Sequence, residues 1–224
     1  MAAVVSAAQL IQAIQSTLLL PLISHSVTTP KYDLYEVYLF GLCVQAAESI
    51  GMKVSFEDTA GARVNALTLR TSPSAISSQA PRFTHASLSM NNAVRLEVHL
   101  GIYLRAASGV SHEGDIVVID AAEGGRARAL QTDPRVNGAA VVIEAKFHAA
   151  NIRLRTGREF LGLVADLGGG PPIFVSSSPG ASVHKLLSHR SRSGHFELIP
   201  GSNQQNELKS RIATKLRDYL ARRP

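Results

Sequence analysis

Residues 139–147, AAVVIEAKF, constrain the fold more than any other segment of this 224-residue chain. The run is almost wholly apolar, which is typical of a strand buried on both faces of a sheet. Its two charged residues, Glu144 and Lys146, are two positions apart, so the alternation of a strand places them on the same face. Burying an acid and a lysine is costly unless each is compensated. The segment therefore predicts either an ion pair or a divalent cation that Glu144 shares with a carboxylate on the adjacent strand.

The rest of the chain alternates between helical and strand periodicity. Apolar residues at helical spacing predict helices over residues 3–20, 31–50, 156–167, 181–189 and 203–222. Alternating apolar and polar residues predict strands over 52–57, 63–70 and 82–90. A long hairpin is expected over 94–107 and 111–120, and mostly apolar runs predict strands over 139–147 and 173–178. We expect loops over 71–81 and 121–138, the second because it contains Gly124-Gly125 and Asp133-Pro134, and a turn at GGGPP (168–172).

This order of elements predicts an α/β fold with a mixed central sheet. No internal repeat or linker divides the chain, so we expect a single domain over residues 1–224. It would comprise an apolar N-terminal helix within 1–30, a core over 31–178 and a basic C-terminal extension over 179–224. The first helix has no charged residue, so it is expected to pack either in the core or against a partner.

Positive charge is concentrated in the later part of the sequence. Residues 1–145 hold 10 basic and 12 acidic residues, a net charge of −2, whereas residues 146–224 hold 13 basic and 5 acidic residues, a net charge of +8. A basic half indicates a polyanionic partner, nucleic acid or an anionic membrane surface, although a solvated face has the same composition. The residues that we expect to contact nucleic-acid phosphates are Arg153, Arg155, Arg158, Lys185, Arg190 and Arg192.

The composition also limits where the protein acts. A single cysteine, Cys43, excludes a disulfide framework and a cysteine-rich zinc site. No apolar run reaches the ~20 residues of a transmembrane helix, and the first 30 residues lack the Lys or Arg of a signal peptide. We therefore expect a cytoplasmic protein that does not interact with a membrane.

If Glu144 shares a cation, the second carboxylate is expected from Asp115, which opens the run DIVVID. Oxygen ligands suit Mg²⁺ or Mn²⁺. Asp115 and Glu144, with the backbone carbonyl of Ala145, are therefore the candidate metal ligands. Lys146 would help to position and deprotonate a water for attack on phosphorus, while the metal stabilises charge on the transferring phosphate.

Two segments of the chain resemble a known family. GDIVVID followed by VVIEAKF resembles the D…ExK signature of the PD-(D/E)xK, or restriction-endonuclease-like, nuclease superfamily. EAKFHAANIRLRTGREFLGLVADL is similar to the equivalent strand and helix of Mrr-like, type IV restriction nucleases. The resemblance covers about residues 31–178 and implies a core of helix, three strands with a hairpin, helix and strand. The chain departs from the family pattern in three ways: Gly114 stands where the proline is expected, the loop before Glu144 is long, and extra strands follow the first helix.

The resemblance implies a third catalytic acid. Many members of the superfamily carry a helical glutamate that reaches the metal site, and Glu36 in DLYEVYLFGLC is the matching position. Glu97, on the first hairpin strand, is its rival. Glu113 lies two residues before Asp115 and either assists the site or is simply solvated.

From this resemblance we expect a metal-dependent nuclease that hydrolyses DNA in a restriction or anti-phage defence system. Such nucleases often act beside a separate motor, sensor or specificity subunit. A homodimer is expected because a double-strand cut commonly needs two active sites. Two alternatives remain open: a catalytically inactive nucleic-acid-binding or assembly subunit on the same fold, and an unrelated domain whose basic C-terminal helix binds a protein or a membrane.

Overall fold

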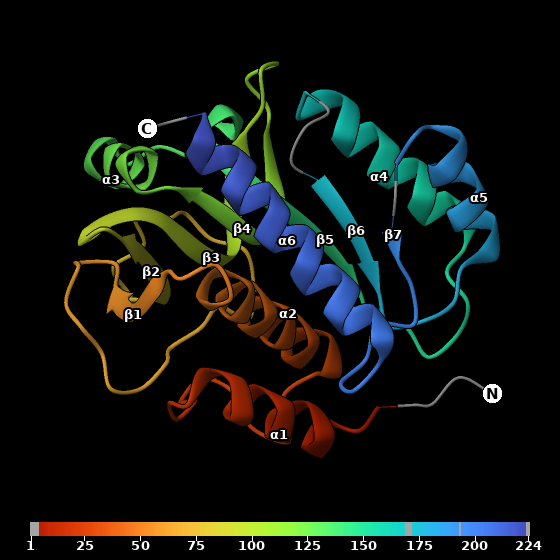
Figure 1. Ribbon diagram of the computed structural model, residues 1–224, viewed down its shortest axis with the longest axis horizontal. Helices are drawn as coiled ribbons and strands as arrows, with labels where there is room; N and C mark the ends of the chain where they lie inside the picture. The colour runs from red at the N-terminus through yellow and green to blue at the C-terminus, as the bar shows by residue number, and fades with distance from the viewer. Residues whose placement is uncertain (1–4, 169–171, 193, 223–224) are drawn as a thin grey trace.

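A seven-stranded mixed sheet forms the centre of the protein (Figure 1). The computed structural model describes residues 5–168, 172–192 and 194–222. Neighbouring strands follow the order of the sequence: β1 to β5 pair antiparallel, and β6 and β7 add in parallel to β5. The strands are β1 Lys53–Asp58, β2 Thr84–Met90, β3 Ala93–Arg105, β4 Ser111–Asp120, β5 Ala139–Lys146, β6 Pro172–Ser176 and β7 Gly194–His195. The expected α/β fold with a mixed sheet is confirmed.

Helices cover both faces of this sheet. α2 (Lys31–Glu48) and α6 (Asn203–Ala221) cross one face, and α1 (Ala7–Leu18) packs against α2 (Figure 1). α3 (Ala121–Leu130) lies against β3 and β4, while α4 (Leu154–Asp166) and α5 (Ala181–His189) pack together beside β6. None of the helices in the described ranges has both the length and the apolar character needed to cross a membrane.

Alternation along β6 shows how the two faces are filled. Ile173 and Val175 enter the largest core cluster, which draws its residues from Val5 through to Leu216. Phe174 points the other way and meets the ring of Phe160 on α4, with 5.3 Å between ring centroids. β6 is therefore buried on both faces, as its short apolar sequence predicts.

The β3–β4 hairpin changes direction beside the candidate site. Leu100 belongs to the core on the α2 side, whereas Ile102, two residues later, belongs to the core on the opposite side. Gly101 between them has φ of +55°, a left-handed conformation that glycine adopts without strain, and it lies across from Asp115. At the hairpin tip, the Ser108 hydroxyl donates to Asp166 of α4 at 3.1 Å. The change of face between Leu100 and Ile102 therefore occurs at Gly101, opposite Asp115 of β4.

The expected loop over residues 121–138 is wrong, because its first half is α3. The Asp120 side chain accepts a hydrogen bond from the Ala122 amide at 2.9 Å and caps the start of this helix. Gly124 and Gly125, which suggested a loop, lie inside the helix. Gly124 is needed there because a Cβ atom would lie 3.0 Å from Cδ of Glu97.

The strand expected over residues 63–70 is also absent. The alternation of apolar and polar residues in this segment predicts burial correctly, since Leu67 and Leu69 are in the core. The backbone of this segment, however, pairs with the loop after α1: the Leu67 amide donates to the Pro21 carbonyl at 2.8 Å. It makes only isolated bridges and adds no strand to the sheet.

The ends of two other expected elements differ or lie outside the described residues. The first helix was expected over residues 3–20 but spans Ala7–Leu18; it starts at a capping box between Ser6 and Gln9 and ends at Leu19 with φ of 56°. Residues 3 and 4 lie outside the described part of the chain, as do residues 169–171 of the expected turn.

Candidate active site

Asp115, Glu144 and Lys146 meet where β4 and β5 separate. The ladder between the two strands ends at the pair Ile116–Ile143, and the next residues are Asp115 and Glu144. Asp115 is buried, and its Oδ2 accepts a hydrogen bond from the Ala145 amide at 2.6 Å. Lys146 Nζ lies 2.6 Å from Oε1 of Glu144. The structure therefore brings together the three side chains that the sequence singled out.

Glu36 approaches this group from α2. Burial, followed by the negative charges of Asp115 and Asp33, raises the pKa of Glu36 to about 9. Burial and the neighbouring charge of Glu144 raise the pKa of Asp115 to about 7. The positive charge of Lys146 acts on both Glu36 and Asp115 and opposes these upward shifts in pKa. Three carboxylates thus share one ammonium, and the cluster favours additional positive charge.

Lys146 remains protonated in this setting. Burial lowers the pKa of Lys146, but the charges of Glu144 and Asp115 outweigh burial, so the net change is upward. A protonated lysine offers three hydrogen-bond donors and no acceptor. Without a bound cation, Lys146 is a donor to neighbouring oxygens rather than a base.

Two further acids border the cluster. Asp33, which the sequence analysis did not single out, is buried on the first turn of α2, and its charge contributes to the raised pKa of Glu36. The i, i+3 spacing of Asp33 and Glu36 on one helix could have indicated this proximity. Glu113 lies at the surface beside the cluster. Partial loss of hydration, and then the negative charge of Glu144, raise the pKa of its carboxyl.

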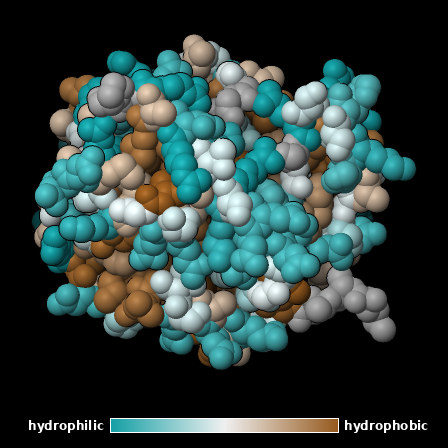
Figure 2. Space-filling model, in the orientation of Figure 1, coloured by the Kyte–Doolittle hydropathy of each residue, from teal (hydrophilic) through white to brown (hydrophobic). Residues whose placement is uncertain are grey.

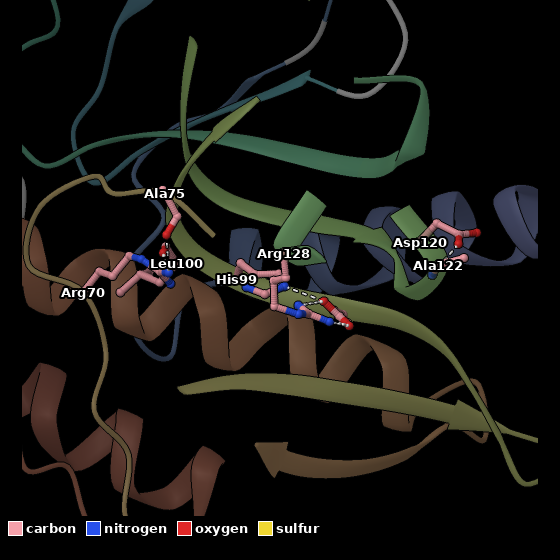
Figure 3. Close-up of polar contacts among 8 residues, drawn as sticks. Arg70, Ala75, His99, Leu100, Asp120, Ala122 and Arg128 are labelled. Atoms are coloured by element: carbon pink, nitrogen blue, oxygen red, sulfur yellow. Dashed lines mark hydrogen bonds and ion pairs between the residues drawn. The ribbon is translucent and has the colours of Figure 1, made fainter. Parts of the chain in front are cut away.

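Glu97, the alternative third acid, is engaged elsewhere. Its carboxylate accepts two hydrogen bonds from Arg128 of α3, at 2.6 and 2.7 Å, and lies 2.8 Å from Nε2 of His99. Figure 3 shows Arg128 reaching from α3 toward the strand that carries His99. The Arg128 and His99 hydrogen bonds hold the pKa of Glu97 well below its ordinary value even though burial opposes the shift. Glu97 is thus already neutralised within the fold.

The residues present fit a hard divalent cation by their chemistry. Among the described residues, no three His, Cys, Asp or Glu side chains are grouped as a ready-made metal site. Mg²⁺, however, is usually bound through only one or two protein carboxylates and keeps several waters. Asp115 and Glu144 supply two adjacent carboxylates with too little positive charge around them, which is the donor set that such an ion requires.

The three arginines expected to bind phosphate lie at the same end of the sheet. Arg153 immediately precedes α4, and Arg153, Arg155 and Arg158 are all exposed. Arg155 makes an exposed ion pair with Glu159 at 2.7 Å. The loop from β5 to α4 is fixed by serines after β6: the His148 amide donates to Ser177 Oγ at 3.1 Å. Arg153 therefore ends a loop whose backbone is held in place, and Arg155 and Arg158 follow it on the first turns of α4.

The other three basic residues do not form one group with these arginines. Lys185 is exposed on α5. Arg190 and Arg192 line a hollow together with Gly168, which lies near the start of β6. Because Lys146 pairs with Ser176 at the end of β6, these two arginines lie toward the opposite end of the sheet. The structure thus separates Arg190 and Arg192 from the three arginines near Lys146.

Taken together, the cluster can hold a hard cation, donate hydrogen bonds from Lys146 and face an exposed basic turn. These are the properties of a site for a phosphate ester. A scan against protein-family models, a search of curated proteins and a search of solved structures each found no match for this chain.

Proposed function

We propose that the chain is a divalent-metal-dependent nuclease that hydrolyses phosphodiester bonds of DNA. The observation that carries the proposal is the meeting of Asp115 and Glu144, from neighbouring strands, beside Lys146. The resemblance of GDIVVID and VVIEAKF to the PD-(D/E)xK signature supports it. So does the order α2, β3, β4, β5, α4 and β6, which, with β1, β2 and α3 set aside as additions, follows the order of elements that the resemblance implies.

The roles of the individual residues follow from their surroundings. Asp115 and Glu144 would hold Mg²⁺ or Mn²⁺, with the Ala145 carbonyl as the third candidate ligand. When bound, the cation supplies positive charge to the transferring phosphate and acidifies a water. The ammonium of Lys146 orients the attacking water and a phosphate oxygen by donating hydrogen bonds. Glu36 supplies a further carboxyl group; its raised pKa keeps it protonated in the metal-free protein, and the charge of a bound cation would favour its ionised form.

Plasmid cleavage tests this proposal directly. The purified chain should nick or linearise plasmid DNA with Mg²⁺ or Mn²⁺ and should be inactive in EDTA. Asp115→Asn, Glu144→Gln and Lys146→Ala should each lower the cleavage rate by about 10²-fold or more. Glu48→Gln, an exposed acid at the end of α2, is the matched control and should retain the wild-type rate. Full cleavage by Glu144→Gln would refute the proposal.

Substrate binding should depend on phosphate contacts near the site. On duplex DNA, log–log plots of affinity against salt should have a slope of roughly −0.9 per phosphate neutralised. Reversing the charges of Arg153, Arg155 and Arg158 should reduce this slope by about one for each arginine that no longer neutralises a phosphate. The biological setting that we propose is restriction or anti-phage defence, with a motor, sensor or specificity subunit and a homodimer as expected partners.

One observation favours a second function, that of a nucleic-acid-binding or assembly subunit without catalysis. Lys146 Nζ lies 2.6 Å from Oε1 of Glu144, so the two charges already neutralise each other, as they do in a purely structural ion pair. That function predicts DNA binding that is unchanged in EDTA and no cleavage with any divalent cation. Glu144→Gln would then leave DNA affinity unaltered but lower the melting temperature.

A further inference from the structure

The C-terminal helix α6 has one buried face and one charged face. Leu208, Ile212 and Leu216 are fully buried, so the helix is an integral part of the domain. Half-exposed Lys215, one turn after Ile212, and Arg222 at the C-cap border the start of β5. The outer side of the helix belongs to the hydrophilic band that crosses the centre of Figure 2. Burial of the apolar face therefore fixes the positions of the charged side chains.

A pocket lies between the C-terminal end of α6 and the start of β5. Its volume is about 480 Å³, within the range of small-molecule sites. Lys215 and Arg222 contribute positive charge to the lining, Asp218 contributes a carboxylate and Tyr219 an aromatic side chain. The Tyr219 hydroxyl donates to the Gly138 carbonyl at 3.1 Å, which fixes its position. The pocket thus combines cations, a hydrogen-bond acceptor and an aromatic surface.

The pocket is separate from the candidate active site. It is lined by Ala139, the first residue of β5, whereas Glu144 lies five residues further along the same strand. At about 3.3 Å per residue, that separation is about 17 Å. No residue of the acidic cluster lines the pocket.

Positive charge accumulates around Lys215. Burial and the charges of Arg211, Arg192 and Arg222 lower the pKa of Lys215, and Asp218 offsets this only in part. Arg192 comes from the segment before β7 and also lines the neighbouring hollow, which shares Gly168 with the pocket. Cations from two separate segments therefore converge on one place, where an anion would relieve their repulsion.

We propose that this pocket binds a phosphate ester, with the phosphate between Lys215 and Arg222 and the organic part against Tyr219. Apolar Val136 and Leu167 complete the surface offered to that organic part. Asp218 is placed to accept a hydrogen bond from a hydroxyl of the ligand. The phosphate can belong to a free nucleotide or to a nucleic-acid strand, and the site does not depend on nuclease activity.

Calorimetric titration of the intact protein in EDTA tests the site without cleavage. The probes are adenosine 5′-monophosphate, adenosine and a 12-base-pair DNA duplex. Lys215→Gln/Arg222→Gln should weaken binding at least tenfold, whereas Arg217→Gln, an exposed arginine of the same helix outside the pocket lining, should change it less than twofold. Adenosine should bind at least tenfold more weakly than its monophosphate.

A second measurement uses only the wild-type chain. Lys215 lines the pocket, so the monophosphate or the duplex should protect it from an acylating reagent. Exposed Lys53 is the internal control and should remain unprotected.

The outcomes decide between the two sources of the phosphate or refute the site. Monophosphate binding that is lost in the double variant supports the site with a free nucleotide as ligand. Duplex binding alone, lost in the double variant but not in Arg217→Gln, supports it with strand phosphate as ligand. Absence of both, an equal loss in Arg217→Gln, or an unprotected Lys215 would overturn the proposal. None of these outcomes depends on whether plasmid is cleaved.

Discussion

Replacement of Glu97 by glutamine tests the assignment of this residue to the fold. Glu97 is 4% exposed and is held by Arg128 and His99 at distances of 2.6 to 2.8 Å. Glutamine has almost the same shape but no charge. Its amide nitrogen cannot accept a hydrogen bond, so one of the Arg128 donors loses its partner.

The size of the effect follows from the burial of the pair. Removing one partner of a buried ion pair costs about 3–5 kcal/mol, because the remaining charge is left uncompensated. The Arg128 side chain is 21% exposed and can be partly hydrated, which favours the lower value, about 3 kcal/mol. For a domain of this size, 1 kcal/mol shifts the melting temperature by about 2–4 °C. We therefore expect Glu97→Gln to lower the melting temperature by about 6–12 °C.

The pH dependence provides an independent check. Because the pKa of Glu97 is lower in the folded state than its ordinary 4.5, its carboxylate stabilises the protein above that pH. This contribution is lost as the pH falls toward the folded-state pKa, so the difference between wild type and Glu97→Gln should shrink on acidification. Urea unfolding at pH 7 and at pH 4 measures both quantities. The reasoning would be refuted if the unfolding free energies of wild type and Glu97→Gln differed by less than about 0.5 kcal/mol at pH 7, or if their difference were the same at pH 4.

Three further predictions concern packing, the acidic cluster and the C-terminal helix. Gly124→Ala should destabilise the protein, because the new methyl would meet Glu97, whereas Gly125→Ala, with nothing within 4 Å, should stabilise it by about 0.5–1 kcal/mol in the same thermal melt. Glu36→Gln should raise the unfolding free energy of the metal-free protein by about 1–3 kcal/mol at pH 8, because glutamine needs no proton on folding, whereas the Glu36 carboxylate, ionised in the unfolded chain, must take one up; it should also slow cleavage. The gain should decrease toward pH 5, where the pH approaches the ordinary pKa of 4.5 and the unfolded chain also takes up the proton; a gain independent of pH would contradict this. Deleting residues 203–224 removes three fully buried aliphatic side chains, worth about 1.5–3 kcal/mol each, and should abolish cooperative unfolding; a retained transition with only weaker DNA binding would contradict the packing role of α6.

Much of the fold could be predicted because the spacing of apolar residues along the sequence indicates which side of a helix or strand is buried. The apolar run of β5, the alternation along the β3–β4 hairpin and the helical spacing of α2 and α6 each predict the element that forms. The failures arose where tertiary contacts decided the outcome. The glycines of α3 suggested a loop, yet one of them is required by the close approach of Glu97. Residues 63–70 alternate like a strand, but their backbone finds its partner in a loop.

The grouping of Asp115, Glu144 and Lys146 was predictable from spacing along two adjacent strands. The approach of Glu36 was expected only from the family resemblance, because it depends on how α2 crosses the sheet. The left-handed Gly101 opposite Asp115 was not predicted at all, since nothing in the local sequence specifies the register of β3 against β4. Asp33 was missed although its spacing from Glu36 on α2 was available.

The two glutamates illustrate why sequence position alone could not assign the third acid. Glu36 and Glu97 each lie among apolar residues, so each requires compensation for burial. In the structure, Glu97 obtains it from Arg128, and its pKa is lowered; Glu36 has mainly other carboxylates around it, and its pKa is raised. A carboxylate that is already paired with a guanidinium gains little from a metal ion. A carboxylate surrounded by acids gains a great deal, because a divalent cation compensates all of them at once. The difference in electrostatic surroundings therefore favours Glu36 as the acid of the proposed metal site and assigns Glu97 to the attachment of α3 to the sheet.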